Sequence, residues 1–268
     1  LSIVTTQSNF FTQILGNKTF SLYNPSHHKT MLLYPSVHPA RRQSQIENHE
    51  DINVSSIKAN LQSGDVLYVP PFWFHTVKSN SRHSVSLSTV SASQVEYFWS
   101  RIIYQQIPFY RLKVGIERVL GVRIFIEALL HELHVESKEV MRDMFNARYL
   151  KIFKTIDDSV PTKWFYVKQT VDKNKKIRFK RFNCNNFPRL KKVAVVLSEK
   201  DDMISYNNLG SAVDKVVFMI ANFKDQYPLS DGILEILLHD YIEELLLYAV
   251  GNEQAFDIAV VLKQCFLL

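Results

Sequence analysis

The residue of this chain best placed to do chemistry is His75, within the segment 64–77 (GDVLYVPPFWFHTV). The apolar run 66–69 has the length of a buried strand, and the Gly-Asp pair before it is a turn signal. Pro70 and Pro71 end that strand because proline cannot donate to a strand ladder. His75 then enters a second strand directly after three aromatic residues. A histidine in such a setting is either a packed structural residue or a metal ligand.

Two further segments carry polar residues in compact blocks: residues 9–18 (NFFTQILGNK) and residues 38–45 (HPARRQSQ). Taken in order with residues 64–77, these blocks resemble N-F-F-x-Q-I-x-G-x-K, H-P-x-x-R-Q-S-Q and G-D-V-L-Y-I-P-x-[YW]-W-[WF]-H. These are motifs of the JmjC/cupin-like (cupin-8) 2-oxoglutarate oxygenases, and most closely of the asparaginyl hydroxylases of hypoxia-inducible factor. The resemblance covers about residues 1–95. It implies a jelly-roll barrel, although a shared fold does not by itself establish function.

The resemblance also implies an iron site. The family holds Fe(II) with two histidines and a carboxylate, which leaves positions open for 2-oxoglutarate and O2. Its first two ligands form H-x-D, with the histidine six residues before the position of Asn9. In this chain those two positions are Ile3 and Thr5, and of the three ligands only His75 remains. Isoleucine has no lone pair, threonine is a poor ligand, and one imidazole is too weak to hold ferrous iron.

Two explanations are open. The chain can be a degenerate member that kept the barrel and lost its iron, a pseudoenzyme without cofactors. Alternatively, residues 1–8 replace the true ligand strand through truncation or a gene-model fault, since the chain begins with Leu1 instead of methionine. In that case the protein is a dioxygenase that uses Fe(II) and 2-oxoglutarate to hydroxylate a protein side chain or a nucleic acid. The sequence leaves its status as an enzyme undecided.

Other roles follow from the resemblance position by position. Lys18 matches the lysine that pairs with the far carboxylate of 2-oxoglutarate, and Asn9 matches an asparagine beside the cosubstrate. Arg42 and Gln43 match substrate-binding donors and are suited to bind a side-chain amide. Ser88 stands where the hydroxylase strand has an asparagine, which weakens the polar contact expected there. Without the motif, Lys18 would be interpreted as an ordinary exposed strand lysine.

Composition agrees with a globular protein. The 268 residues are 46% hydrophobic, enough for one large or two moderate cores. No apolar run approaches the roughly 18 residues that a membrane span needs, so we expect no membrane partner. Cys184 and Cys265 are too few and too far apart in sequence to indicate a disulfide framework or a zinc site. We therefore expect a cytoplasmic or nuclear protein.

The patterns predict a mixed α and β fold: a partial double-stranded β-helix (jelly roll or cupin), then helices, then a second α+β region that is mostly helical. We expect domains at 1–93 (the C-terminal part of the barrel), 94–156 (helical) and 157–268 (a basic hairpin with a helical subdomain). Strands are expected at 18–23, 57–61, 66–69, 76–78, 84–89, 163–170, 176–182 and 193–197. Helices are expected at 94–106, 109–133, 137–156, 211–223, 230–250 and 253–267.

The first helical region resembles the family's dimerisation helices in kind and position only. Its apolar stripe could face a second copy in a homodimer or pack on the chain's own barrel, and the sequence favours neither. The stripe consists of Ile116, Val119, Leu120, Ile124, Leu129 and Leu133.

Charge is concentrated in one segment. Residues 168–192 contain ten Lys or Arg against Asp172 alone, a net charge of +9 in a chain whose total is +6. Such a patch could bind RNA phosphates or an acidic partner, or could simply be a solvated hairpin. Its central residues are Lys173, Lys175, Lys176, Arg178, Lys180 and Arg181. The three functional hypotheses are thus a hydroxylase, a non-catalytic binding module and a dimerisation scaffold.

Overall fold

The computed structural model describes residues 3–36, 38–46, 52–113, 115–150, 187–199, 208–227, 229–250 and 262–267. The chain forms two compact units. One unit comprises Leu1–Ile103 and Phe223–His239, and the other comprises Tyr104–Asn222 and Asp240–Leu268.

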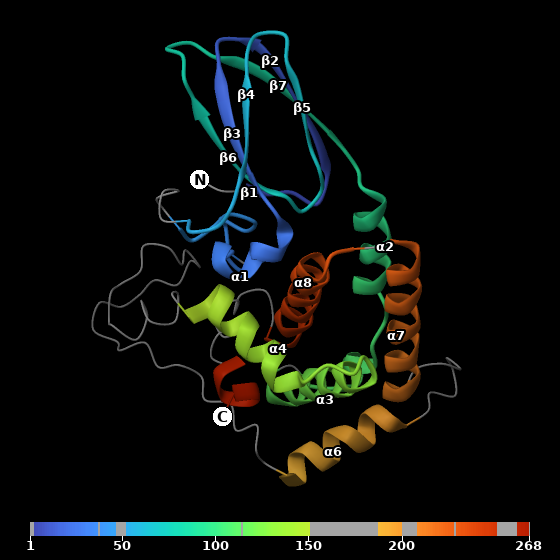
Figure 1. The fold of residues 1–268 in the computed structure, drawn as a ribbon. Coiled ribbons are helices and arrows are strands. Elements are labelled where there is room, and N and C mark those ends of the chain that lie inside the picture. The colour runs from blue at the N-terminus through green and yellow to red at the C-terminus, as the bar shows by residue number, and fades with distance from the viewer. Residues whose placement is uncertain are drawn as a thin grey trace, which may run out of the picture. The chain divides into compact units, whose positions relative to one another are not determined.

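The first unit contains two antiparallel sheets, with strand orders β1-β6-β3-β4 and β5-β2-β7 (Figure 1). The strands are β1 (Ile3–Val4), β2 (Ser8–Leu15), β3 (Lys18–Tyr23), β4 (Ile57–Leu61), β5 (Val66–Val69), β6 (Phe74–Ser79) and β7 (Val85–Ser91). This arrangement confirms the predicted partial double-stranded β-helix followed by a mostly helical region. The strand at β2 was not among those expected from the sequence.

The barrel core lies between the two sheets. Alternate residues of each strand point inward, as strand geometry requires. The fully buried members of this core are Phe20, Leu22, Leu61 and Val69, and Phe11, Ala59, Leu67 and Trp73 pack against them. Gly16 turns the chain from β2 into β3 with a φ of +74°, and a Cβ there would collide with the carbonyl oxygen of His83. Glycine is therefore required at this turn.

Short helices close one end of the barrel. β3 leads into a 3-10 turn, η1 (Pro25–His27), and then α1 (His28–Met31). The Oδ1 atom of Asn24 accepts a hydrogen bond from the backbone N–H of Ser26 at 2.9 Å. Helix α2 (Gln94–Ile103) follows β7.

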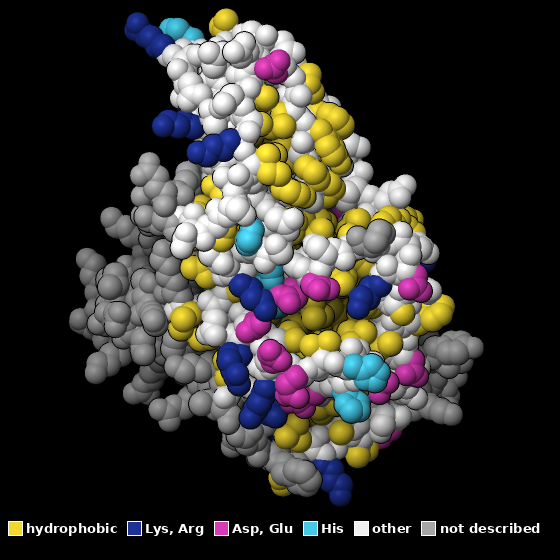
Figure 2. Space-filling view, in the orientation of Figure 1, with side chains coloured by type: hydrophobic (Ala, Val, Ile, Leu, Met, Phe, Trp, Pro, Cys, Tyr) yellow, Lys and Arg dark blue, Asp and Glu magenta, His cyan; other side chains and the backbone are white. Residues whose placement is uncertain are grey.

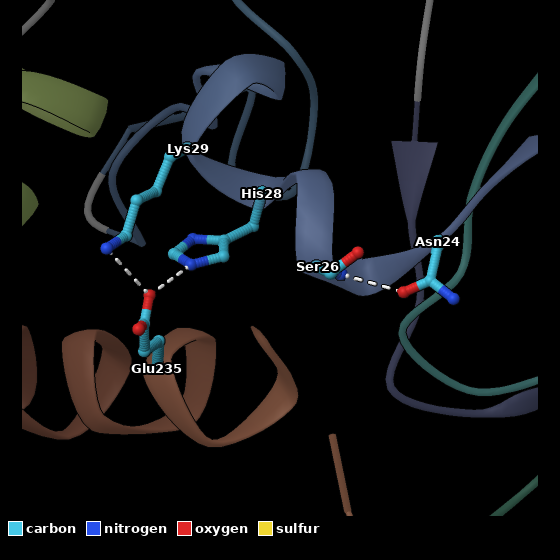
Figure 3. Close-up of polar contacts among 5 residues, drawn as sticks. All are labelled: Asn24, Ser26, His28, Lys29 and Glu235. Atoms are coloured by element: carbon cyan, nitrogen blue, oxygen red, sulfur yellow. Dashed lines mark hydrogen bonds and ion pairs between the residues drawn. The ribbon is translucent and has the colours of Figure 1, made fainter. Parts of the chain in front are cut away.

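The first turns of α8 (Asp231–Val250) belong to the same unit and contact the start of α1. The Oε2 atom of Glu235 lies 2.6 Å from Nε2 of His28 and 3.3 Å from Nζ of Lys29 (Figure 3). Gly232 lies against the backbone of Pro25, so this end of α8 is seated on the turn that leaves β3.

The second unit is helical. It contains η3 (Pro108–Arg111), α3 (Ile116–Glu132), α4 (Ser137–Met144), a π-helical turn η4 (Phe145–Tyr149), α6 (Phe187–Ser198), most of α7 (Leu209–Gln226), the remainder of α8 and a π-helical turn η6 (Leu262–Leu267). None of the helices in the described part of the chain has the length and apolarity of a membrane span. Cys265 is disulfide-bonded, which the sequence positions of the two cysteines did not indicate.

Some sequence expectations are wrong or incomplete. Residues 193–197 lie in helix α6 and not in a strand, because Val193 and Leu197 are four residues apart and both are buried on one helical face. The expected helix 109–133 is interrupted at Gly115, whose φ is +96°. Helix α4 is capped by Glu136, whose side chain accepts from the N–H of Lys138. The expected hairpin at 163–182, most of the helix at 253–267 and the central basic residues lie outside the described residues.

Part of the apolar stripe that could have formed a homodimer interface is buried in this structure. Val119, Leu120 and Leu129 are buried within that unit. These three side chains are therefore not free to face a second copy, and a homodimer through the C-terminal helices stays a prediction.

Candidate functional site

His75 is the second residue of β6, which lies between β1 and β3 in the four-stranded sheet. Its Cα pairs with Ile3 on one side and with Leu22 on the other. The side chain is 5% exposed, and its ring centroid lies 5.8 Å from that of Phe11, edge-on. Because Phe11 belongs to the opposite sheet, the imidazole points into the interior of the barrel.

Burial favours the neutral imidazole at this position. Desolvation lowers the pKa of His75, and a hydrogen bond with the backbone of Trp73 offsets part of that effect. The Nδ1 atom of His75 is buried and has no hydrogen-bond partner among the described residues. A neutral imidazole with an unsatisfied interior nitrogen can bind a metal or hydrogen-bond a ligand.

The two positions that precede β2 do not complete a metal site. Ile3 stands opposite His75 in the sheet and offers no lone pair. The hydroxyl of Thr5 donates a hydrogen bond to the backbone carbonyl oxygen of Gln7 at 3.1 Å. The backbone carbonyl oxygen of Thr5 accepts from the N–H of Phe72 at 2.6 Å, which places Thr5 beside the turn before β6.

The residues present therefore do not fit ferrous iron. A facial triad needs two histidines and a carboxylate on one face of the metal. His75 supplies one ligand, while Ile3 and Thr5 supply no histidine and no carboxylate. Within the described ranges, no three His, Cys, Asp or Glu side chains come together in a way that could hold a metal ion.

Lys18 lies in a polar cluster inside the barrel. Its Nζ donates to the hydroxyl of Ser86, which belongs to β7 of the opposite sheet. The same Ser86 hydroxyl donates to Oε1 of Gln13 at 3.0 Å, and Nε2 of Gln13 donates to the hydroxyl of Ser84 at 2.9 Å. We refer to Gln13, Lys18, Ser84 and Ser86 as the lysine cluster. It offers one positive charge beside hydroxyl and amide groups, which is suited to an anionic oxygen ligand.

Asn9 faces the same interior, two alternations before Gln13 on β2. It is buried, and its Oδ1 accepts a hydrogen bond from the hydroxyl of Ser88 at 2.8 Å. The polar contact that the sequence led us to consider weakened at Ser88 is thus present. Asn9, Gln13 and Ser86 are thus polar residues on the inward side of β2 and β7, and Lys18 reaches them from the start of β3, whose other inward residues, Phe20 and Leu22, are apolar.

The block 38–45 forms a tight loop between β3 and β4. The ring of His38 stacks on Tyr34 at 4.3 Å, and its Nδ1 accepts from the N–H of Ala40 at 3.0 Å. The carbonyl oxygen of Leu33 accepts from Nε2 of Gln45 at 2.8 Å. Burial lowers the pKa of His38, so this ring is also favoured in its neutral form. These contacts tie the loop to the segment that precedes it.

Arg42 and Gln43 project from this loop with their side chains available. Arg42 has a φ of +67°, and both residues are half-buried. No other described residue hydrogen-bonds the guanidinium of Arg42 or the side-chain amide of Gln43. Two donor-bearing side chains next to each other in a fixed loop can recognise an amide or a carboxylate.

The strand register orders these groups along the barrel. β3 ends at Tyr23, whose Cα pairs with Phe74, the neighbour of His75, and the chain then passes through η1 and α1 before it reaches the loop with Arg42. Lys18 is at the other end of β3, four residues before Leu22, which is the partner of His75. Four residues of strand correspond to about 13 Å. His75 and Lys18 are thus separated along the interior of the barrel.

Fold and interior together define a double-stranded β-helix with a polar inner face. Residues 6–104 match the family model of the cupin-like domain. The barrel is therefore a cupin-like domain, and the match supports a cupin/JmjC-like family. The matched range contains Asn9, Lys18, Arg42, Gln43 and His75, and it begins after positions 3 and 5.

The structure places the side chains of Asn9, Lys18 and His75 on the inward side of the barrel strands, whereas Arg42 and Gln43 lie on the separate loop 38–45. The sequence did not identify Ser86 as the partner of Lys18, or Gln13 and Ser84 as the residues linked to it through Ser86. A signal was available, because serines alternate with apolar residues from Ser84 to Ser88. Sequence alone did not say which face of that strand pointed inward.

Proposed function

We propose that the cupin-like domain is a non-catalytic binding module for a small dicarboxylate of the 2-oxoglutarate type. The observation that supports this proposal is the contrast between two inward positions. Lys18 keeps a hydroxyl- and amide-lined place inside the barrel, whereas the residue paired with His75 in the strand register is an isoleucine. The groups that would anchor the ligand are retained, and those that would hold iron are not.

In this proposal the Lys18 ammonium binds one carboxylate of the ligand, and the Ser86 and Gln13 side chains hold the ammonium in place. Asn9 and His75 are donors for the other end of the ligand. A hydrogen bond to a charged group contributes about 1.5–3 kcal/mol, so loss of the ammonium weakens binding about 10- to 150-fold.

Titration calorimetry of the full chain with 2-oxoglutarate in the presence of a metal chelator tests this. We expect metal-independent binding that Lys18→Met weakens by that factor. Lys78→Met, which removes an exposed lysine of β6, is the matched control and should bind like the unmodified chain. Absence of binding, or equal loss in the two variants, would contradict the proposal.

The second candidate function is a hydroxylase of the asparaginyl-hydroxylase type, acting on a protein side chain or a nucleic acid. The unpartnered Nδ1 atom of His75 and the available side chains of Arg42 and Gln43 support it. Incubation with Fe(II), 2-oxoglutarate and O2 distinguishes the candidates. Succinate formation that His75→Ala abolishes would replace the binding module with the enzyme. RNA or an acidic protein as partner of the basic segment is a separate proposal, and its test is binding that weakens steeply with salt.

A further inference from the structure

The three-stranded sheet has an apolar outer face. In β2 the inward residues are Asn9, Phe11 and Gln13, so the alternate residues point outward. Thr12 pairs with Val66 of β5 and with Leu87 of β7, which places these three side chains in one row across the sheet. Phe10 pairs with Tyr68 in the adjacent row, and the two rings are 5.0 Å apart.

This outer sheet face is solvent-exposed. Its large apolar side chains are between 43% and 60% exposed, and they are Phe10, Ile14, Leu15, Val66, Tyr68, Val85 and Leu87. Figure 2 shows hydrophobic side chains gathered on the barrel, on the side where Figure 1 labels β5. Thr12 and Thr89 complete the rows, so no outward residue of these strands is charged. The usual barrel pattern is reversed on β7, where serines point inward and Val85 and Leu87 point outward.

The exposed fractions correspond to roughly 600 Å² of apolar surface, which is at the upper limit for the largest patch of a typical monomer. Patches of that size mark interaction sites. A contact between two such faces would bury about 1,200 Å² in total, the lower limit for a specific, stable interface.

We propose that this face is the interface of a homodimer in which two copies stack their outer sheet faces. Sheet faces pack on sheet faces at about 10 Å with side chains interdigitating, and a two-fold axis lets one patch meet its own copy. Charge within the face does not oppose a second copy, because no outward residue of these strands is charged and two such faces meet without like charges in contact. The interface is distinct from the C-terminal helices considered above, and it does not depend on ligand binding inside the barrel.

Sedimentation velocity of the full chain over a range of concentrations tests the proposal. We expect a reversible dimer that becomes monomeric in the double variant Val66→Glu/Leu87→Glu. These residues flank Thr12, so the variant places four carboxylates in the interface. Phe218→Glu, which alters another exposed apolar residue, on α7, is the matched control and should remain dimeric. A chain that is monomeric at every concentration, or a dimer that the double variant does not dissociate, overturns the proposal.

A second measurement guards against a folding defect in the charged variant. Thr12 lies on the central strand of the face, so Thr12→Cys should form an intermolecular disulfide under mild oxidation. Ser79→Cys, at the exposed end of β6 in the other sheet, should not. Equal cross-linking of the two cysteine variants would place any dimer contact elsewhere and overturn the proposal independently of the glutamate variants.

Discussion

Ile3 lies directly opposite His75 in the four-stranded sheet, as Cα partners of β1 and β6. In an antiparallel pair, directly opposite residues have Cβ atoms about 4.5–5.5 Å apart and share one face of the sheet. A metal bound to His75 would therefore be within reach of a ligand introduced at position 3.

That relationship predicts that Ile3→His combined with Thr5→Asp creates a metal site. With Co(II) as the probe, the double variant should bind with visible absorption bands that the unmodified chain lacks. If each added ligand contributes at least about 1.4 kcal/mol, the affinity should rise about 100-fold or more. The matched control adds His75→Ala to the double variant and should return the affinity to the original value. Binding that survives this third change would show that the metal is held elsewhere.

Burial of His75 predicts a pH-dependent stability. Because burial lowers its pKa below 6.5, the unfolded chain takes up a proton below about pH 6.5 that the folded chain lacks. The free energy of unfolding should thus fall with pH below about 6.5, by up to about 1.4 kcal/mol per pH unit, until the folded pKa is reached. Urea unfolding at pH 7.5, 6.5 and 5.5 should show a smaller slope for His75→Asn than for the unmodified chain.

Two other histidines serve as comparisons in the urea experiment. Burial also lowers the pKa of His38, so a part of the slope should persist in His75→Asn. His83→Asn, the same change at an exposed histidine, is the matched surface control. An identical slope in His75→Asn and the unmodified chain would mean that His75 is not a source of the pH dependence.

The barrel strands could be predicted because the residue patterns that indicate them lie within short segments of the sequence. Alternating residues set the strands, and three compact motifs located Asn9, Lys18, Arg42, Gln43 and His75. The neighbours of these residues could not be predicted in the same way. Ser86, which binds Lys18, is 68 residues away in sequence, and its partnership depends on how two sheets face each other.

Helix α6 and the start of α8 illustrate the same limit. Residues 193–197 are rich in β-branched side chains, which favour a strand, but tertiary burial at Val193 and Leu197 favours the helix. Nothing in the sequence of α8 indicated that Glu235 would contact His28, because a contact over 207 residues leaves no local pattern.

The contact of α8 with the turn after β3 predicts an unusual effect of a glycine substitution. A Cβ at Gly232 would lie 2.6 Å from the carbonyl oxygen of Pro25 and 2.7 Å from Cα of Ser26. Gly232→Ala should thus destabilise the chain by about 1–3 kcal/mol, more than the gain of about 1 kcal/mol in helix propensity. Urea unfolding measures the difference. Gly210→Ala in α7, where the nearest atom is 3.6 Å away, is the control and should be neutral or stabilising.

The last prediction concerns a buried charge cluster in the helical unit. The Nη1 atom of Arg148 lies 2.6 Å from Oδ1 of Asp240 and 3.1 Å from Oε2 of Glu243, and the side chains of Arg148 and Glu243 are 3% and 0% exposed. Arg148→Met would remove the ion pair that Arg148 makes with the buried Glu243 carboxylate. We expect a loss of about 3–5 kcal/mol in the free energy of unfolding, measured in urea.

The helix surface offers a matched control for that prediction. The Nε atom of Arg123 lies 2.8 Å from Oε1 of Glu127, one turn along the solvent-facing side of α3, and Arg123→Met should cost only about 0.3–0.5 kcal/mol. Adding Glu243→Met to Arg148→Met should recover part of the loss, because it removes the buried carboxylate that lost its ion pair to Arg148. Equal costs for the two arginines, or no recovery in the double variant, would mean that the cost at Arg148 does not arise from this ion pair.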